Sequence, residues 1–129
     1  MFIKWTRHRY GERVYCEALL VRAVRVEGKP RQEIIARLGS FTVERMEECR
    51  DDPWPSARAR EWDPRCQFWR RATTVLRNQF PCDGPEREGL KRDRRAVRAL
   101  NLDEATLARL EAQLAAVVPR PPAEEPVEA

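Results

Sequence analysis

The segment 64–80 places basic and neutral hydrogen-bonding side chains on one side of a predicted helix. At 100° per residue they span roughly a third of the helix circumference. The face consists of Gln67, Arg70, Arg71, Thr74, Arg77 and Asn78. Arginines bring charge and the threonine and amide groups bring neutral hydrogen bonds, a mixture typical of surfaces that contact a phosphate backbone. A solvated basic face without a partner has the same composition, so both interpretations stay open.

Two other segments, a predicted turn and a predicted helix, carry basic side chains at positions expected to face solvent. Lys29 and Arg31 lie at a predicted turn. A predicted helix over 86–99 carries its basic residues on the outer side, at Lys91, Arg92, Arg95 and Arg98. Residues 1–41 hold 9 basic and 4 acidic side chains, and residues 64–100 hold 10 and 4. Charge segregated in this way favours a polyanionic partner if the two blocks share a face.

Metal chemistry has little support in the sequence. The four cysteines, Cys16, Cys49, Cys66 and Cys82, form no C-x-x-C pair, and the single histidine is His8. Reduced, mostly buried thiols are therefore expected, with a zinc site assembled from distant elements as the alternative. The acidic run Glu44, Glu47 and Glu48 suits a solvated helix face better than a metal site. We expect no bound metal.

Catalytic motifs are also lacking. The chain has no phosphate-binding glycine loop, no nucleophile motif and no carboxylate pair whose placement exceeds chance. We therefore expect no enzymatic activity and no cofactor. No apolar run approaches the ~20 residues that a membrane span needs, and Lys4, Arg7 and Arg9 interrupt the N-terminus where a signal peptide would be hydrophobic. A cytoplasmic protein without a membrane partner is expected.

The elements that position these residues begin with three extended segments over 2–41. Turns are predicted at Tyr10-Gly11 and at 27–30, EGKP, where Gly28 takes positive φ at no steric cost. A strand from Val14 to Val26 would exceed the usual ~5–6 residues. A bulge is expected near the apolar run 19–21, because the alternation of faces breaks there. The segment predicts a three-stranded antiparallel sheet.

Helices are predicted over 43–49, 64–80, 86–99 and 102–118. Thr42 and Asp63 are the expected N-caps of the first two, and Pro64 follows Asp63 at a favoured first helical position. Asn101 and Glu104 have the form of a capping box for the last. The apolar stripe expected to cover the sheet consists of Phe68, Trp69, Ala72, Val75, Leu76 and Phe80.

The expected fold is α+β: an N-terminal sheet packed by an amphipathic helix and followed by two further helices. One domain is expected over 1–118, with a disordered tail over 119–129. Residues 51–63 are expected to form a connector, in which Trp54 and Trp62 either pack against the body or stack on exposed bases. The leucine seam at Leu107, Leu110 and Leu114 favours core over a dimer zipper, because it spans barely two heptads. The oligomeric state stays open.

One stretch of the sheet is similar to a known family. The run VRAVRVEGKPRQ at 21–32, followed by IIARLG at 34–39, resembles the amino-terminal β-hairpin segment of bacterial insertion-sequence transposases of the DDE, RNase H-like type. In these proteins a Y-R-V-x-G-K-x-R-Q turn and a closing L-G link short strands ahead of the catalytic domain. The resemblance covers about residues 2–41. The catalytic domain and its three metal-binding carboxylates would need a couple of hundred further residues, so the resemblance implies a recognition or accessory piece.

These observations together predict a small non-enzymatic accessory protein that binds nucleic acid, with double-stranded DNA as the expected partner. The basic sheet and helix surfaces would contact the phosphate backbone, and the protein would be associated with a mobile element. The alternative is an adaptor or inhibitor, encoded by a phage or mobile element, whose basic surface docks an acidic protein. The same charge segregation serves both functions.

Overall fold

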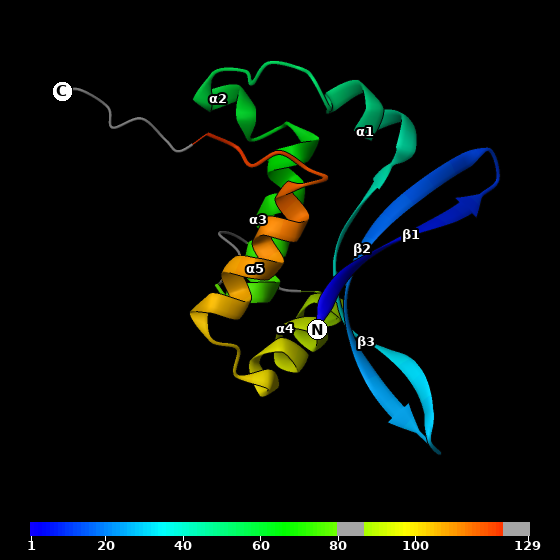
Figure 1. The fold of residues 1–129 in the computed structure, drawn as a ribbon. Coiled ribbons are helices and arrows are strands. Elements are labelled where there is room, and N and C mark those ends of the chain that lie inside the picture. Colours follow the sequence, from blue (N-terminus) through cyan, green and yellow to red (C-terminus); the bar gives the residue numbers. More distant parts are fainter. Residues whose placement is uncertain (80–86, 123–129) are drawn as a thin grey trace.

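The N-terminal third of the chain forms the expected sheet, in the order β1–β2–β3 (Figure 1). The structure, a computed structural model, describes residues 1–79 and 87–122. The strands are β1 (Phe2–Tyr10), β2 (Arg13–Val26) and β3 (Lys29–Thr42), all antiparallel. Gly11 takes positive φ in the first turn. Glu27 (φ 53°) and Gly28 (φ 78°) form the second, and positive φ at both central residues is typical of a type I′ hairpin turn.

The centre of β2 contains the predicted irregularity. The β2–β3 register shifts between Ala18 and Leu19 and again between Leu20 and Val21, so the pairing is irregular at the expected place, but the extra residues, Leu38 and Ile35, lie on β3, which is therefore the bulged strand. Ala18, Leu19, Leu20 and Val21 are all buried, although alternate residues of a strand point to opposite faces. The middle of β2 is therefore buried on both sides, whereas the ends of the strand are exposed.

Within the described residues, five helices follow the sheet and lie on one side of it (Figure 1). They are α1 (Val43–Cys49), α2 (Ala57–Arg60), α3 (Pro64–Arg77), α4 (Glu88–Leu100) and α5 (Glu104–Ala115). Helix α2 lies in the segment expected to be a connector. Helix α3 ends three residues earlier than predicted, because Asn78 adopts the left-handed conformation as its C-cap. Phe80, Cys82 and the predicted start of the helix over 86–99 lie outside the described residues.

The start of α5 differs from the predicted capping box. The N-cap is Asp103, whose side chain accepts a hydrogen bond from the Thr106 N–H at 2.8 Å. Asn101 is instead the left-handed C-cap of α4 (φ 49°). Asn tolerates this conformation better than most residues. Asn and Asp are both favoured N-cap residues, and the prediction of Asn101 as the N-cap was wrong. The caps at Thr42 and Asp63 are confirmed.

Helix α3 covers the inner face of the sheet with aromatic rings. Phe68 stacks on Trp5 and Phe41, at centroid distances of 5.7 and 4.9 Å. Leu110 and Leu114 of α5 are fully buried in the same core, so the leucine seam is intramolecular. The Trp69 Nε1–H donates to the Val118 and Pro119 carbonyls.

The first residues of the predicted tail are held against the body. Arg120 pairs with Glu111 at 2.6 Å and lies over the Trp69 ring at 4.6 Å. Residues 119 and 120 thus contact the body, and the disorder expected over 119–129 stays a prediction. Residues 123–129 lie outside the described residues, and the prediction for them is unchanged.

Arg65 ties the segment after α1 to the start of α3. Its guanidinium, 4% exposed, donates to both carboxylate oxygens of Asp63 and to the carbonyls of Cys49 and Asp52. It also lies over the Trp54 ring at 3.8 Å. The hydrogen bond from Arg65 lowers the pKa of the Asp63 carboxyl. Trp54 is thus packed as expected, but Trp62 is 76% exposed and is not.

Gly39 is required where β3 passes beneath α3. Its φ is +156°, and a Cβ there would lie 2.7 Å from the Phe68 ring. Gly39→Ala is therefore expected to lower the free energy of unfolding by about 1–3 kcal/mol, measured by urea denaturation. Gly89→Ala is the control. Gly89 lies in α4 with nothing near its Cβ position, so alanine should stabilise the protein by about 0.5–1 kcal/mol. Equal stability of the two variants would contradict this packing.

Candidate nucleic-acid interface

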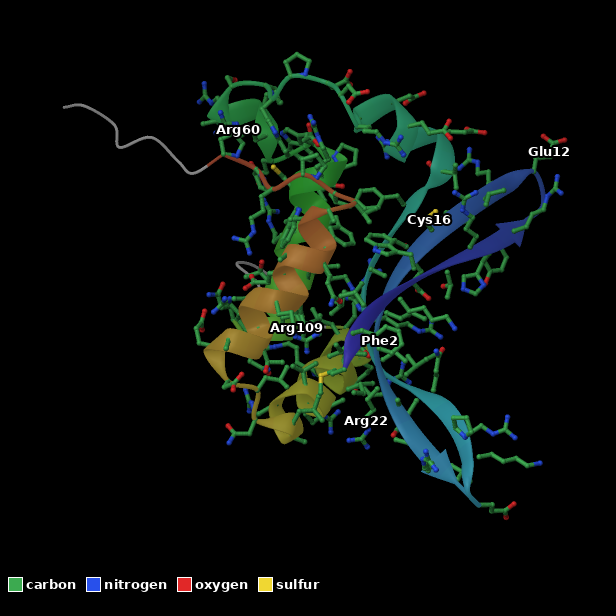
Figure 2. All side chains as sticks on the ribbon, viewed as in Figure 1. Phe2, Glu12, Cys16, Arg22, Arg60 and Arg109 are labelled. Atoms are coloured by element: carbon green, nitrogen blue, oxygen red, sulfur yellow. The ribbon has the colours of Figure 1, made fainter. Side chains whose placement is uncertain are left out.

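The ends of β2 and β3 extend beyond the helices as a two-stranded arm, here residues 22–33 (Figure 1). All of its residues are exposed except Val24, which is partly exposed. Arg22 Nε donates to Glu33 at 2.8 Å and joins the two strands where the arm leaves the body (Figure 2). The turn at Glu27-Gly28 closes the other end. The arm is therefore held by its turn, its ladder of backbone hydrogen bonds, this ion pair and a hydrogen bond from Lys4 Nζ of β1 to Gln32 at 2.8 Å, with little apolar cover.

The outer part of the arm is positively charged. Arg25, Lys29 and Arg31 are exposed, and none forms an ion pair with any residue in 1–79 or 87–122. Lys29 and Arg31 were expected at an accessible turn, and the structure places them there. Arg25 lies on β2, opposite Pro30 of β3.

Helix α4 supplies a second set of accessible cations at the same end of the molecule as the arm. The helix packs against β3 through an inward side on which Val97 is buried, and Figure 1 shows it near the base of the arm. Its exposed basic residues are Lys91, Arg92, Arg95 and Arg98. Lys91 lies 3.4 Å from Glu88, and Arg95 Nε donates to the Lys91 carbonyl at 3.4 Å. Both contacts are long and solvent-exposed, so they hold these side chains weakly.

The predicted face of α3 is not an open surface. Thr74 is 6% exposed, and its hydroxyl donates to the Arg70 carbonyl at 2.7 Å. Asn78 caps the helix, and its carbonyl accepts a hydrogen bond from Arg94 of α4. Thr74 is therefore buried and Asn78 is partly buried, where the helical pattern predicted accessible side chains. The Thr74 hydroxyl and the Asn78 carbonyl serve the end of α3 and its junction with α4, whereas the buried Asn78 Oδ1 has no hydrogen-bond partner among the described residues.

Arg71 and Arg77 are ion-paired inside the helical layer. Arg71 pairs with the buried Asp93 of α4 at 3.1 Å. Arg77 donates to Glu104 at 2.9 Å and to the buried Glu111, both on α5. The hydrogen bonds to Glu104 and Glu111 raise the pKa of Arg77, and the Arg77 guanidinium lowers the pKa of Glu104. These two arginines, with side chains 37% and 28% exposed, join α3 to α4 and α5, so their ion pairs compete with the phosphate contacts expected of them.

Arg70 remains exposed but lies apart from the arm. It lines a hollow of about 430 Å³ together with Arg58, Arg60 and Cys66. This hollow adjoins α2, at the opposite end of the molecule from the arm (Figure 1). Arg70 and Arg77, expected to act as a pair on one face, thus have different surroundings. The predicted residues fall into three places: the arm and α4 at one end, the buried junctions of α3, and the α2 hollow.

The face of the sheet turned away from the helices, here the open face, was not identified from the sequence. Lys4, Leu19 and Arg37 lie side by side across its three strands. A hollow of about 360 Å³ on this face is lined by His8, Tyr10, Tyr15, Glu17, Arg37 and Ser40. The available signal was the strand alternation, which places residues 15, 17 and 19 together. The alternation alone could not identify the hollow, because the register shift decides which residues of β3 lie beside residues 15, 17 and 19.

The described residues give no indication of a metal site. Within residues 1–79 and 87–122, no three His, Cys, Asp or Glu side chains lie close enough together to hold an ion. Burial raises the pKa of the Cys49 and Cys66 thiols, which favours their protonated form. Cys16 is buried. Among the helices of the described residues, none has both the length and the apolar character needed to cross a membrane.

The arm is the most distinctive feature of this surface, and it lies inside a segment that matches a known family. Residues 3–59 match the family model of the IS1634 family transposase, N-terminal domain. The resemblance of the sheet to insertion-sequence transposases is thereby confirmed. The match covers the sheet, α1 and most of α2, and it associates the chain with mobile elements. No curated protein and no solved structure matched the chain.

Proposed function

We propose that this chain binds double-stranded DNA, with the arm as the main contact. The observation that carries the proposal is the exposed two-stranded ribbon whose Arg25, Lys29 and Arg31 have no carboxylate partner among the described residues. The major groove of B-DNA is wide enough to admit such a ribbon. The match of residues 3–59 to a transposase N-terminal domain supports a DNA partner.

Helix α4 provides the flanking contacts in this proposal. Lys91, Arg95 and Arg98 lie on its exposed side, at the end of the molecule that carries the arm. With the ribbon in a groove, these side chains contact the adjacent phosphates. Together with the three arm cations they make about six phosphate contacts, the usual source of non-specific affinity for DNA. The role is recognition without catalysis, because the sequence has no motif for a nucleophile or a phosphate-binding loop.

A comparison of two charge-matched variants tests the proposal. Lys29→Ala/Arg31→Ala removes two cations from the arm, and Arg58→Ala/Arg70→Ala removes two from the α2 hollow. Fluorescence anisotropy with a random-sequence duplex at about 0.1 M salt should show that the arm variant binds roughly 50-fold more weakly than the unmodified protein. Each lost phosphate contact removes the counterion release that contributed to the affinity. The control variant should bind within a few-fold of the unmodified protein.

Two outcomes would contradict the proposal. Equal losses in both variants would mean that affinity follows net charge and does not depend on the arm. Absence of duplex binding at low salt would favour the alternative in which the basic surface docks an acidic protein.

A further inference from the structure

We propose that the hollow on the open face binds a single unpaired nucleotide of the DNA held by the arm. The inference rests on the proposed function and names a more specific ligand for it. All three strands contribute to the hollow: His8 and Tyr10 from β1, Tyr15 and Glu17 from β2, and Arg37 and Ser40 from β3. Its volume of about 360 Å³ lies within the ~300–1,000 Å³ typical of small-ligand sites.

The sheet register places these side chains next to one another. His8 lies opposite Tyr15, and Glu17 lies opposite Ser40. Arg37 lies opposite Leu19, two residues along β2 from Glu17. Alternation places Tyr15 and Glu17 on one face of β2, and the register shift between Ala18 and Leu19 brings Arg37 and Ser40, three positions apart on β3, to that same face, away from the helices. The rigid paired strands hold the polar groups in place before any ligand arrives.

Two tyrosines supply a stacking surface. The Tyr10 and Tyr15 rings meet edge to face, with centroids 5.8 Å apart and planes at 70°. Each ring keeps at least one face that its partner does not cover, and Tyr10 is 71% exposed. A nucleobase stacks on such a ring whatever its sequence, but only if it is not already stacked between neighbours in a duplex. The hollow therefore suits an unpaired base.

The polar groups complete the recognition of a nucleotide. Glu17 has a side chain only 21% exposed, and its carboxylate accepts no hydrogen bond from any described residue; the His8 Nε2 atom lies 4.0 Å from one of its oxygens. A carboxylate with unused acceptors is suited to the exocyclic amino group of cytosine, adenine or guanine. Arg37 forms no ion pair with the described residues and can pair with the phosphate of the same nucleotide.

The hollow lies within reach of DNA bound at the arm. Tyr15 and Val26 stand at the two ends of one continuous strand. At ~3.3 Å per residue they are separated by at most about 36 Å, close to the ~34 Å of one duplex turn. Figure 2 shows both ends of the open face, with Glu12 at the tip of the β1–β2 hairpin and Arg22 at the base of the arm. A duplex contacted by the arm can therefore place an unpaired nucleotide over the hollow.

Three DNAs of otherwise identical sequence test the inference: a fully paired duplex, the same duplex with one extra unpaired cytosine, and that duplex with an abasic residue in place of the cytosine. Anisotropy should show the cytosine bulge bound about ten-fold more tightly than the abasic bulge, because stacking on an aromatic ring contributes at this level. Tyr10→Leu should reduce this ratio to about one. Trp62→Leu, which removes an equally exposed aromatic ring away from the hollow, should keep it.

A second measurement separates stacking from amino-group recognition. Glu17→Gln should keep the preference for the cytosine bulge over the abasic one but lose most of any preference for cytosine over thymine. Equal binding of the cytosine and abasic bulges by the unmodified protein would overturn the inference while leaving binding of the paired duplex intact. Failure to bind the paired duplex would overturn the proposed function, and the inference with it.

Discussion

Replacing Arg65 by methionine should lower the free energy of unfolding by about 3–5 kcal/mol in urea denaturation. The substitution keeps an apolar stem but leaves the Asp63 carboxylate, 9% exposed, without its counter-charge. It also leaves the Cys49 and Asp52 carbonyls without a donor. Breaking one side of a buried ion pair typically costs this much, because the remaining charge stays buried. Arg58→Met, on the exposed surface of α2, is the matched control and should change stability by less than about 0.5 kcal/mol.

The same ion pair has a pH signature. Asp63→Asn keeps an oxygen that can cap α3 but removes the charge that pairs with Arg65. The folded protein lowers the pKa of Asp63, so its contribution is fully present above the ordinary value near ~3.9 and is lost as pH falls through the lower folded value. The stability difference between the unmodified protein and Asp63→Asn should therefore shrink in acid. A difference that grows in acid, or an Arg65→Met variant of unchanged stability, would contradict this account.

Arg77→Met should destabilise the protein and leave DNA binding largely unchanged. Removing Arg77 leaves the buried Glu111 with Arg120 as its remaining cation and frees the exposed Glu104. A loss of about 1–3 kcal/mol is expected, since Arg120 offsets part of the cost. Thermal or urea unfolding measures the first effect. Anisotropy with a random-sequence duplex, at a temperature where the variant is folded, measures the second.

The result separates two roles for the same arginine. If Arg77→Met had normal stability but bound DNA weakly, Arg77 would be a DNA-contacting residue, which would contradict its assignment to the α3–α5 junction. The conservative Arg77→Lys variant gives a further check. Lysine restores the charge but not the two-pronged geometry of a guanidinium, so it should recover only part of the lost stability.

Local signals in the sequence were sufficient for the sheet and for most helix boundaries. A glycine at a turn and a carboxylate before Pro64 each have a local physical meaning, and the structure contains the turn and the cap that they predict. The break in apolar alternation at 19–21 marked where the strand pairing is irregular, although the extra residues lie on β3. Lys29 and Arg31 were placed correctly for the same reason. Both follow, on β3, a two-residue turn that has to be exposed.

The candidate site depended on contacts that no local pattern contains. On a helical wheel, Arg71 and Arg77 lie opposite the apolar stripe and look solvated. Their partners are Asp93, Glu104 and Glu111, which are 22 to 34 positions further along the chain and reach α3 only after α4 and α5 have packed. Later helices cover part of the polar side of α3 and leave Gln67 and Arg70 exposed, and the helical pattern alone could not show that Arg71 and Arg77 are ion-paired.

The open-face hollow was missed for a related reason. Tyr15 and Glu17 belong to β2, but their neighbours come from two other strands, and the bulge shifts the pairing of β3 by one position at each irregularity. Alternation predicts which residues of one strand share a face. It does not predict which residues of the next strand lie beside them, because a slip of one residue reverses the faces.

The salt dependence of duplex binding tests the central claim most directly. For the unmodified protein, the logarithm of the binding constant plotted against the logarithm of salt concentration should fall with a slope of about −5, as expected for about six phosphate contacts. Lys29→Ala/Arg31→Ala should make the slope shallower by about 2, whereas Arg58→Ala/Arg70→Ala should leave it unchanged. A slope that is the same for the unmodified protein and the arm variant would show that the arm does not contact the phosphate backbone.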